Sequence, residues 1–270
     1  MKSCINGATT MPYNLEHDIK SANKVGFKGV EIWVSKLREF LRDHTEEVLK
    51  RLLSDSAISA PSLCAFSGFI YCSEGEFGKR VQDLKNLLKV GQTVGTEYVI
   101  ICAEGFGDRR IEEAKHAHIS RIRRLSSITG DYGIKIAMEW FWELPLAIEI
   151  VREIDDERVG LLVDTFHWYR GDGNLEHLKQ VPSDKVFFLH VNDCEDLPRN
   201  DLTDKNRLYC GKGILPLSDL FSIIRDKNYD GYLSVEVFRE EYWKKDPEEI
   251  SSMAYRTLTE TASRCGFSLS

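Results

Sequence analysis

Four side chains that can bind a divalent metal ion follow one another in the second half of the chain. Each ends or lies within a short apolar run, and the set is Glu139, Asp164, His190 and Glu236, at intervals of 25, 26 and 46 residues. Carboxylate oxygens together with a neutral imidazole nitrogen are suitable ligands for Mn²⁺, Zn²⁺, Co²⁺ or Mg²⁺. Without an ion, three acids at one place would repel one another and their pKa values would rise. If the fold brings the four side chains together, they predict a site for one divalent metal ion.

The apolar runs around these residues belong to a pattern that covers the whole chain. Eight runs of strand type lie at 3–6, 29–33, 58–66, 97–102, 134–139, 159–164, 186–192 and 231–236. Most are continuous instead of alternating, which is typical of parallel strands covered on both faces. Segments between them have helical spacing, such as the apolar residues 147, 150, 151 and 154. Asp246 and Pro247 predict the start of a last helix that runs to about Arg264.

Eight strand–helix units in 270 residues predict an α/β fold, a (β/α)₈ TIM barrel, with residues 1–270 forming a single domain. The alternative is a doubly wound open sheet. Such a sheet would carry a glycine-rich phosphate loop after an early strand, and "INGATT" at 5–10 is not one. In a barrel the C-terminal ends of the strands meet at one face, where the chemistry gathers. The barrel therefore predicts that the four candidate ligands lie close together.

Composition limits the partners of the protein. A net charge of −7 gives no general attraction to nucleic acid, which needs clustered Lys and Arg. No apolar run approaches the roughly 20 residues that span a bilayer, and the first residues lack the apolar core of a signal peptide. Seven cysteines without a CxxC pair favour reduced thiols. We therefore expect a cytoplasmic protein that acts on a small molecule, with neither nucleic acid nor membrane as a partner.

Several motifs give the chain a family resemblance. They are "INGATT" at 5–10, "VDTFHW" at 163–168, "LHVNDCEDLPRNDLTDKNRLYCGKG" at 189–213 and "LSVEVFREEYW" at 233–243. With them the chain resembles, over almost its whole length, the xylose-isomerase-like TIM-barrel superfamily of sugar isomerases and epimerases. Within that superfamily it is most similar to the inosose isomerases. The resemblance implies that Glu139, Asp164, His190 and Glu236 are the ligands of one metal ion.

The resemblance also implies substrate contacts. His167 of the "DxxH" motif and Arg207 of the "RxxxGxG" loop match residues that hold substrate oxygens in relatives. Beside them we expect Glu31, Trp33 and Trp140 to contact the substrate, since they lie at or just after strand ends. Two departures bear on the choice of substrate. The loop after strand 134–139 is shorter than in inosose isomerases, and Cys210 stands where the family usually has proline.

The expected activity is a metal-dependent isomerisation or epimerisation of an inosose or a similar hydroxyketone through an enediolate. Glu139 and Glu236 would remove and return the proton, and a metal-promoted hydride shift is the alternative route. A second expectation is a metal-dependent dehydratase of an inosose or of 3-dehydroshikimate. A DNA-repair endonuclease of the same superfamily would need further histidines after the third and fourth strands, where there are none, and a sugar-binding barrel would have little need of the ion. Barrels of this kind often associate, so a homo-oligomer is expected, with segment 238–249 as a candidate contact surface.

Overall fold

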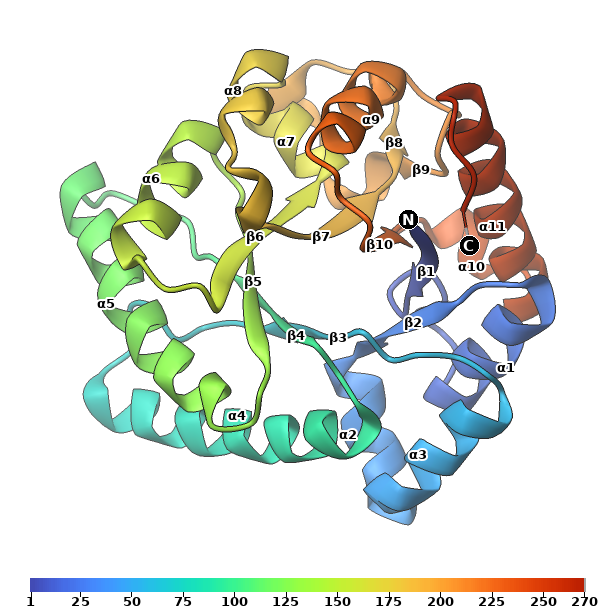
Figure 1. Ribbon diagram of the computed structural model, residues 1–270, viewed down its shortest axis with the longest axis horizontal. Coiled ribbons are helices and arrows are strands. Elements are labelled where there is room, and N and C mark those ends of the chain that lie inside the picture. Colours follow the sequence, from blue (N-terminus) through green and yellow to red (C-terminus); the bar gives the residue numbers. More distant parts are fainter. Residues whose placement is uncertain (270) are drawn as a thin grey trace.

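The computed structural model describes residues 1–269, and its centre is a closed barrel of parallel strands enclosed by a ring of helices (Figure 1). Around the barrel the order is β1-β10-β7-β6-β5-β4-β3-β2. The strands are β1 (Lys2–Asn6), β2 (Gly29–Trp33), β3 (Ser62–Phe66), β4 (Tyr98–Cys102), β5 (Lys135–Glu139), β6 (Val159–Asp164), β7 (Val186–Val191) and β10 (Tyr232–Val235). Every neighbouring pair in the ring is parallel. This confirms the predicted (β/α)₈ barrel.

Helices on the outside follow the strands of the barrel. They are α1 (Leu15–Val25), α2 (Val34–Asp43), α3 (Glu46–Asp55), α4 (Glu74–Val94), α5 (Ile111–Gly130), α6 (Leu144–Ile154), α7 (Thr165–Gly171), α8 (Leu175–Gln180), α9 (Leu217–Asp226), α10 (Glu240–Trp243) and α11 (Pro247–Arg264). The last helix has the predicted bounds, because the Asp246 side chain accepts hydrogen bonds from the backbone N–H groups of Glu248 and Glu249. None of the helices within residues 1–269 has the length and apolar character needed to cross a bilayer.

The long connection between β7 and α9 contains a small hairpin that the sequence pattern does not predict. Its strands are β8 (Asp193–Cys194) and β9 (Arg207–Leu208), which pair antiparallel. Three short 3₁₀ turns also interrupt the connections: η1 (Ser183–Lys185), η2 (Arg199–Asp201) and η3 (Asp204–Asn206). The hairpin carries Arg207 back to the mouth of the barrel.

The apolar core has two parts. The larger part fills the space between the strands and the helices. The smaller part fills the inside of the barrel and consists of Cys4, Cys64, Ile100, Ala137, Leu162, Phe187, Phe188 and Tyr232. Ala137, Leu162 and Phe188 lie two residues before Glu139, Asp164 and His190, so they point inward one layer deeper. We call this inner cluster the apolar plug.

The third strand is shorter than the apolar run 58–66 predicts. Pro61 has no N–H to offer a neighbouring strand, although its carbonyl oxygen accepts from the backbone N–H groups of Glu97 and Tyr98. Before it, Ser59 makes only an isolated bridge with Gly29. The continuous strand therefore begins at Ser62.

Two aromatic residues of the candidate contact surface at 238–249 pack against other residues of the same chain. Tyr242 stacks on Tyr209 at 4.2 Å between ring centroids, and Phe238 packs edge-on against Trp33 at 5.9 Å. These two rings are therefore committed to packing within the chain. The involvement of the segment in an oligomer stays a prediction.

Candidate active site

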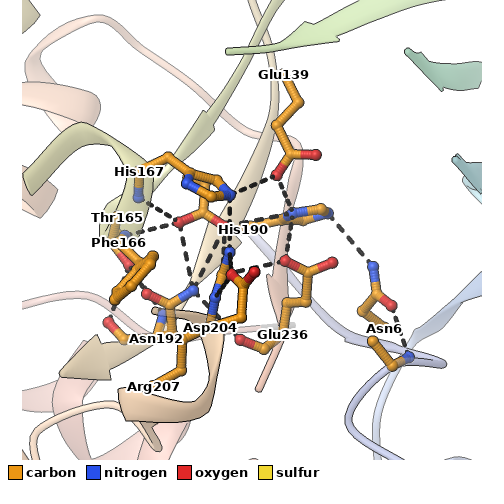
Figure 2. A network of polar contacts seen from close by, with 12 residues as sticks. Asn6, Glu139, Thr165, Phe166, His167, His190, Asn192, Asp204, Arg207 and Glu236 are labelled. Atoms are coloured by element: carbon orange, nitrogen blue, oxygen red, sulfur yellow. Dashed lines mark hydrogen bonds and ion pairs between the residues drawn. The ribbon is translucent and has the colours of Figure 1, made fainter. Parts of the chain in front are cut away.

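The C-terminal ends of the barrel strands surround a cavity of about 140 Å³. Its polar lining comes from Glu139, His167, Asp204, Arg207 and Glu236, and its aromatic lining from Trp33, Phe141 and Phe238. Figure 2 shows Glu139 and Glu236 converging on His190, with His167 and Arg207 on one side of it and Asn6 on the other. The cavity is thus the place where the candidate ligands meet.

The four candidate ligands come together because parallel strands end at the same face. Glu139 and Asp164 are the last residues of β5 and β6, His190 pairs with Asp164 in register, and Glu236 follows β10 directly. One ligand atom from each lies within 4.8 Å of all the others. From His190 Nδ1 the distances are 3.4 Å to Glu139 Oε1, 3.6 Å to Asp164 Oδ2 and 3.1 Å to Glu236 Oε2. All four side chains are buried.

The histidine at the centre of this group is held from behind. Its Nε2 lies 2.8 Å from Glu31 Oε1, and the Asn6 side-chain amide donates to the same oxygen at 2.6 Å. A carboxylate at this position orients a ligating imidazole and raises its basicity. The other nitrogen, Nδ1, is buried and makes no aligned hydrogen bond in the described structure, although three carboxylate oxygens lie within 3.6 Å of it. This orphaned nitrogen faces three carboxylates, which is the arrangement that a divalent ion would complete.

The charges of the group also fit a cation. Burial raises the pKa of Glu236 to about 7, in spite of the nearby His190 and Arg207. Burial alone would lower the pKa of His190, but Glu236 and Glu31 hold it well above its usual value. Both shifts mean that the group takes up protons, on the Glu236 carboxyl and on the His190 imidazole, which offset its negative charge. The residues present therefore fit a metal ion with an O₃N donor set.

Arg207 ties the group together from the side of the β8–β9 hairpin. Its Nη1 donates to Asp164 Oδ2 at 2.6 Å and to Glu236 Oε2 at 3.1 Å, and its Nη2 donates to His167 Nε2 at 2.9 Å. Burial by itself would raise the pKa of Asp164, but the guanidinium of Arg207 holds it well below the usual range. Asp164 therefore stays ionised and serves both the centre and the arginine.

Of the five residues expected to contact the substrate, three line the cavity and two do not. Trp33 lines the cavity, and so do His167 and Arg207. Glu31, however, is fully buried beneath His190, and Trp140 is 1% exposed and packs in the outer core. Glu31 pairs in register with Asn6, two residues before the end of β2, so it lies one layer below the strand ends. Neither side chain therefore lines the cavity, since Glu31 contacts His190 and Trp140 packs in the outer core.

Two further residues of the site, Phe141 and Asn192, were not predicted from the sequence. Phe141 lines the cavity and lies edge-on to His167, with the ring centroids 4.5 Å apart. Side chains alternate along an extended chain, so a residue two positions after the inward Glu139 is the expected one to face the mouth. Asn192 donates to the backbone carbonyl oxygen of Glu236 at 3.2 Å and accepts from Thr165 Oγ1 at 2.7 Å. It joins the ends of β6, β7 and β10 behind the carboxylates.

The loop that carries Arg207 depends on Asp193 and Gly213. Asp193 Oδ1 accepts from the backbone N–H groups of Cys194 and Leu215, both at 2.9 Å. A Cβ at Gly213 would overlap the backbone carbonyl oxygen of Cys194 and the Asp193 carboxylate. This close approach explains the last glycine of the "RxxxGxG" motif.

Gly213→Ala should lower the free energy of unfolding by about 1–3 kcal/mol, because the backbone of the loop must move away from β8. Urea denaturation would measure the change. Lys212→Ala is the matched control, since Lys212 is exposed and neighbours the same glycine, and it should leave the denaturation midpoint nearly unchanged. A Gly213→Ala protein as stable as the parent would show that the loop does not need this approach.

Glu31→Gln should weaken binding of Zn²⁺ about tenfold or more, since outer carboxylates of this type contribute about 10–100-fold to metal affinity. The glutamine keeps an oxygen that can accept from His190 Nε2, but it removes the negative charge behind the imidazole. Competition with a chromogenic chelator would give the affinity. Glu39→Gln, an exposed position on α2, is the control. Equal affinities of the Glu31→Gln protein and the parent would contradict this role.

Comparison with known proteins agrees with the geometry. An inosose isomerase of Bacillus subtilis is 31% identical over 274 residues, which covers 98% of this chain and 99% of that protein. The inosose isomerase of Halalkalibacterium halodurans is also 31% identical and covers 98% of this chain and 97% of its own. A 3-dehydroshikimate dehydratase of Pseudomonas aeruginosa is 27% identical over 86% of this chain, but over only 36% of its own length.

Solved structures show the same likeness. The crystal structure of the IolI protein with a bound zinc atom superposes with a TM-score of 0.93 at 31% identity, over 98% of this chain and 99% of that chain. D-psicose 3-epimerase has the same fold, with a TM-score of 0.80 at 13% identity. The family model for the xylose isomerase-like TIM barrel matches residues 19–259. The chain therefore belongs to the xylose isomerase-like TIM-barrel family.

Proposed function

We propose that this protein is a metal-dependent isomerase of an inosose, a cyclic hydroxyketone with a ring of hydroxyl groups. The observation that carries the proposal is the O₃N group around the orphaned Nδ1 of His190, at the mouth of a barrel similar to inosose isomerases over nearly its whole length. The cavity of about 140 Å³ suits one six-membered ring. The ion would be held by Glu139, Asp164, His190 and Glu236, and Mn²⁺, Zn²⁺, Co²⁺ and Mg²⁺ are the candidates.

A bound divalent ion would act as a Lewis acid on the carbonyl group and lower the pKa of the neighbouring C–H. The protein must then move a proton between two adjacent carbons. Glu139 and Glu236 come from β5 and β10, which β6 and β7 separate, so they reach the substrate from different sides. Each has two carboxylate oxygens, of which one could hold the ion and the other the proton. We assign removal and return of the proton to this pair.

Neighbouring groups position the two glutamates. The Cys102 thiol donates to Glu139 Oε2 at 3.3 Å, and Arg207 Nη1 donates to Glu236 Oε2 at 3.1 Å. His167 accepts from Arg207 through Nε2, and its buried Nδ1 has no partner in the described structure. A hydroxyl oxygen of the substrate is a suitable partner for that N–H. His167 would therefore orient the ring, while Trp33 and Phe141 cover its C–H faces.

The test couples metal content to turnover. The purified protein is analysed for metals by plasma mass spectrometry, and scyllo-inosose is then supplied in deuterated water and followed by proton NMR. We expect formation of a second inosose with deuterium at the reacting carbon, lost on chelation and restored by one of the four ions. Conversion without deuterium would favour a hydride shift. Release of water from the ring would instead indicate a dehydratase. The similarity to 3-dehydroshikimate dehydratase supports this alternative. No conversion in the loaded protein would refute the proposed function.

A further inference from the structure

The cavity above the metal ligands presents an unusual balance of charge to a substrate. Three carboxylate side chains line it, those of Glu139, Asp204 and Glu236, and Asp164 lies directly behind them. Within the part of the chain that the structure describes, Arg207 is the one Lys or Arg that contributes to this lining. Whether the cavity can bind an anion therefore depends on how free this guanidinium is.

The guanidinium of Arg207 is fully engaged. Nη1 donates to Asp164 and Glu236, Nη2 donates to His167, and Nε donates to Asp204 Oδ1 at 3.0 Å. Two aromatic rings also lie against the guanidinium, that of Phe166 at 4.7 Å and that of Phe238 at 5.5 Å from its central carbon. The side chain is 1% exposed. A carboxylate or phosphate on a substrate would have to break one of these contacts to reach it.

His167 does not replace Arg207 as a cation. Because its Nε2 accepts a hydrogen bond from Arg207 Nη2 at 2.9 Å, that nitrogen carries a lone pair and the ring is neutral. The imidazole can donate one N–H to a hydroxyl or carbonyl oxygen, but it brings no charge to the cavity. The described lining therefore offers an anionic substrate no unpaired positive side chain.

Asp204 is the acid that neutralises the outer side of Arg207. It belongs to η3, where Thr203 and Asn206 form a capping box that fixes the turn. Its Oδ1 contacts both Nε and Nη2 of Arg207 at 3.0 Å, while 55% of the side chain stays exposed at the mouth. With Oδ1 used twice, Oδ2 is the oxygen left to accept a hydroxyl group of a substrate. The same oxygen would repel a carboxylate.

We propose that Asp204 determines specificity, making the cavity select an uncharged polyhydroxy ketone and reject carboxylated or phosphorylated ring substrates. This inference rests on the proposed function in one respect only, namely that this cavity is where the substrate binds. A bound divalent ion does not make the site positive. The three carboxylates of Glu139, Asp164 and Glu236 carry one more charge than the ion, and the charges of Asp204 and Arg207 cancel. The excess stays negative, so a substrate anion pays a like-charge penalty that a neutral polyol does not.

The test compares two unreactive rings that differ by one charge. Quinate carries a carboxylate, and quinamide is the neutral amide of the same polyol. Their affinities for the zinc-loaded protein are measured by isothermal titration calorimetry. We expect the parent protein to prefer quinamide by at least about tenfold, the scale of one unfavourable charge pair. In Asp204→Asn the affinity for quinate should rise at least about fivefold, while the affinity for quinamide changes less than twofold.

Asp201→Asn is the matched control, because it removes the same charge from an exposed position of the same connection without contacting Arg207. It should retain the preference of the parent protein. Asp204→Ser provides a second removal of the charge if the asparagine variant folds poorly. An Asp204 variant that gains no affinity for quinate, or a parent protein that binds both rings equally, would overturn the proposal. Neither measurement involves turnover, so a failure to isomerise scyllo-inosose would refute the proposed function without deciding this one.

Discussion

Glu236→Gln should yield a folded barrel whose isomerisation rate is lower by about 10²–10⁴-fold, the range expected when a general acid–base group is removed. The glutamine has the same shape, so the contact with Arg207 Nη1 can persist through its amide oxygen. It can neither accept nor return the proton of the substrate. Glu139→Gln should give a loss of similar size. The rate is read from the proton NMR signal of inosose, at saturating metal.

The control for both variants is Glu97→Gln. Glu97 is exposed and precedes β4, so it lies at the opposite end of the barrel from the site. It should retain the full rate. The metal content of each variant must be measured as well, because a glutamine that expels the ion would reduce the rate for another reason. A Glu236→Gln protein that holds the metal and keeps a substantial rate would remove Glu236 from the acid–base role.

Removing the ion should lower the melting temperature by about 10 °C. A ligand present at 1,000 times its dissociation constant stabilises the folded state by about 4 kcal/mol, and each kcal/mol shifts the midpoint of a chain of this size by about 2–4 °C. The physical cause is the group of buried carboxylates around His190, which the ion neutralises. Differential scanning calorimetry with and without a chelator would measure the shift.

The variant Asp164→Asn distinguishes the effect of the ion on the melting temperature from an effect of the local structure. The Asp164 side chain accepts hydrogen bonds from the backbone N–H groups of Phe166 and His167, which cap α7, and an asparagine oxygen can do the same. The variant should therefore keep its helix but lose most of its metal, and chelator should no longer change its melting temperature. If the chelator still lowered the melting temperature of a metal-free Asp164→Asn protein by the same amount, the shift would not come from this site.

The barrel and the meeting of the four candidate ligands could be predicted because both follow from local patterns. Continuous apolar runs mark buried parallel strands, and their C-terminal ends share one face. His190 lies within its strand, where the flanking Leu189 and Val191 give no hint of a role, yet the register with Asp164 places it at the centre. The spacing along the chain was sufficient for this part because each ligand lies in a barrel strand or, for Glu236, directly after one.

Depth within the barrel was harder to predict. Glu31 and Trp33 belong to the same strand, but only Trp33 is at its end, so Glu31 lies beneath His190. Trp140 directly follows an inward residue and therefore faces outward, whereas Phe141 returns to the cavity. The network of Arg207 was out of reach for a different reason. It depends on the β8–β9 hairpin, whose two-residue strands leave no periodic signal.

The apolar plug beneath the metal ligands has a consequence for how such a protein can change over time. Because Ala137, Leu162 and Phe188 close the barrel below the site, the ligands are isolated from the loops at the opposite end. We expect substitutions there to change stability but not the chemistry. The connections at the mouth, such as the one that carries Asp204, instead line the cavity. One barrel can therefore inherit its reaction unchanged while new loops give it a different molecule to act on.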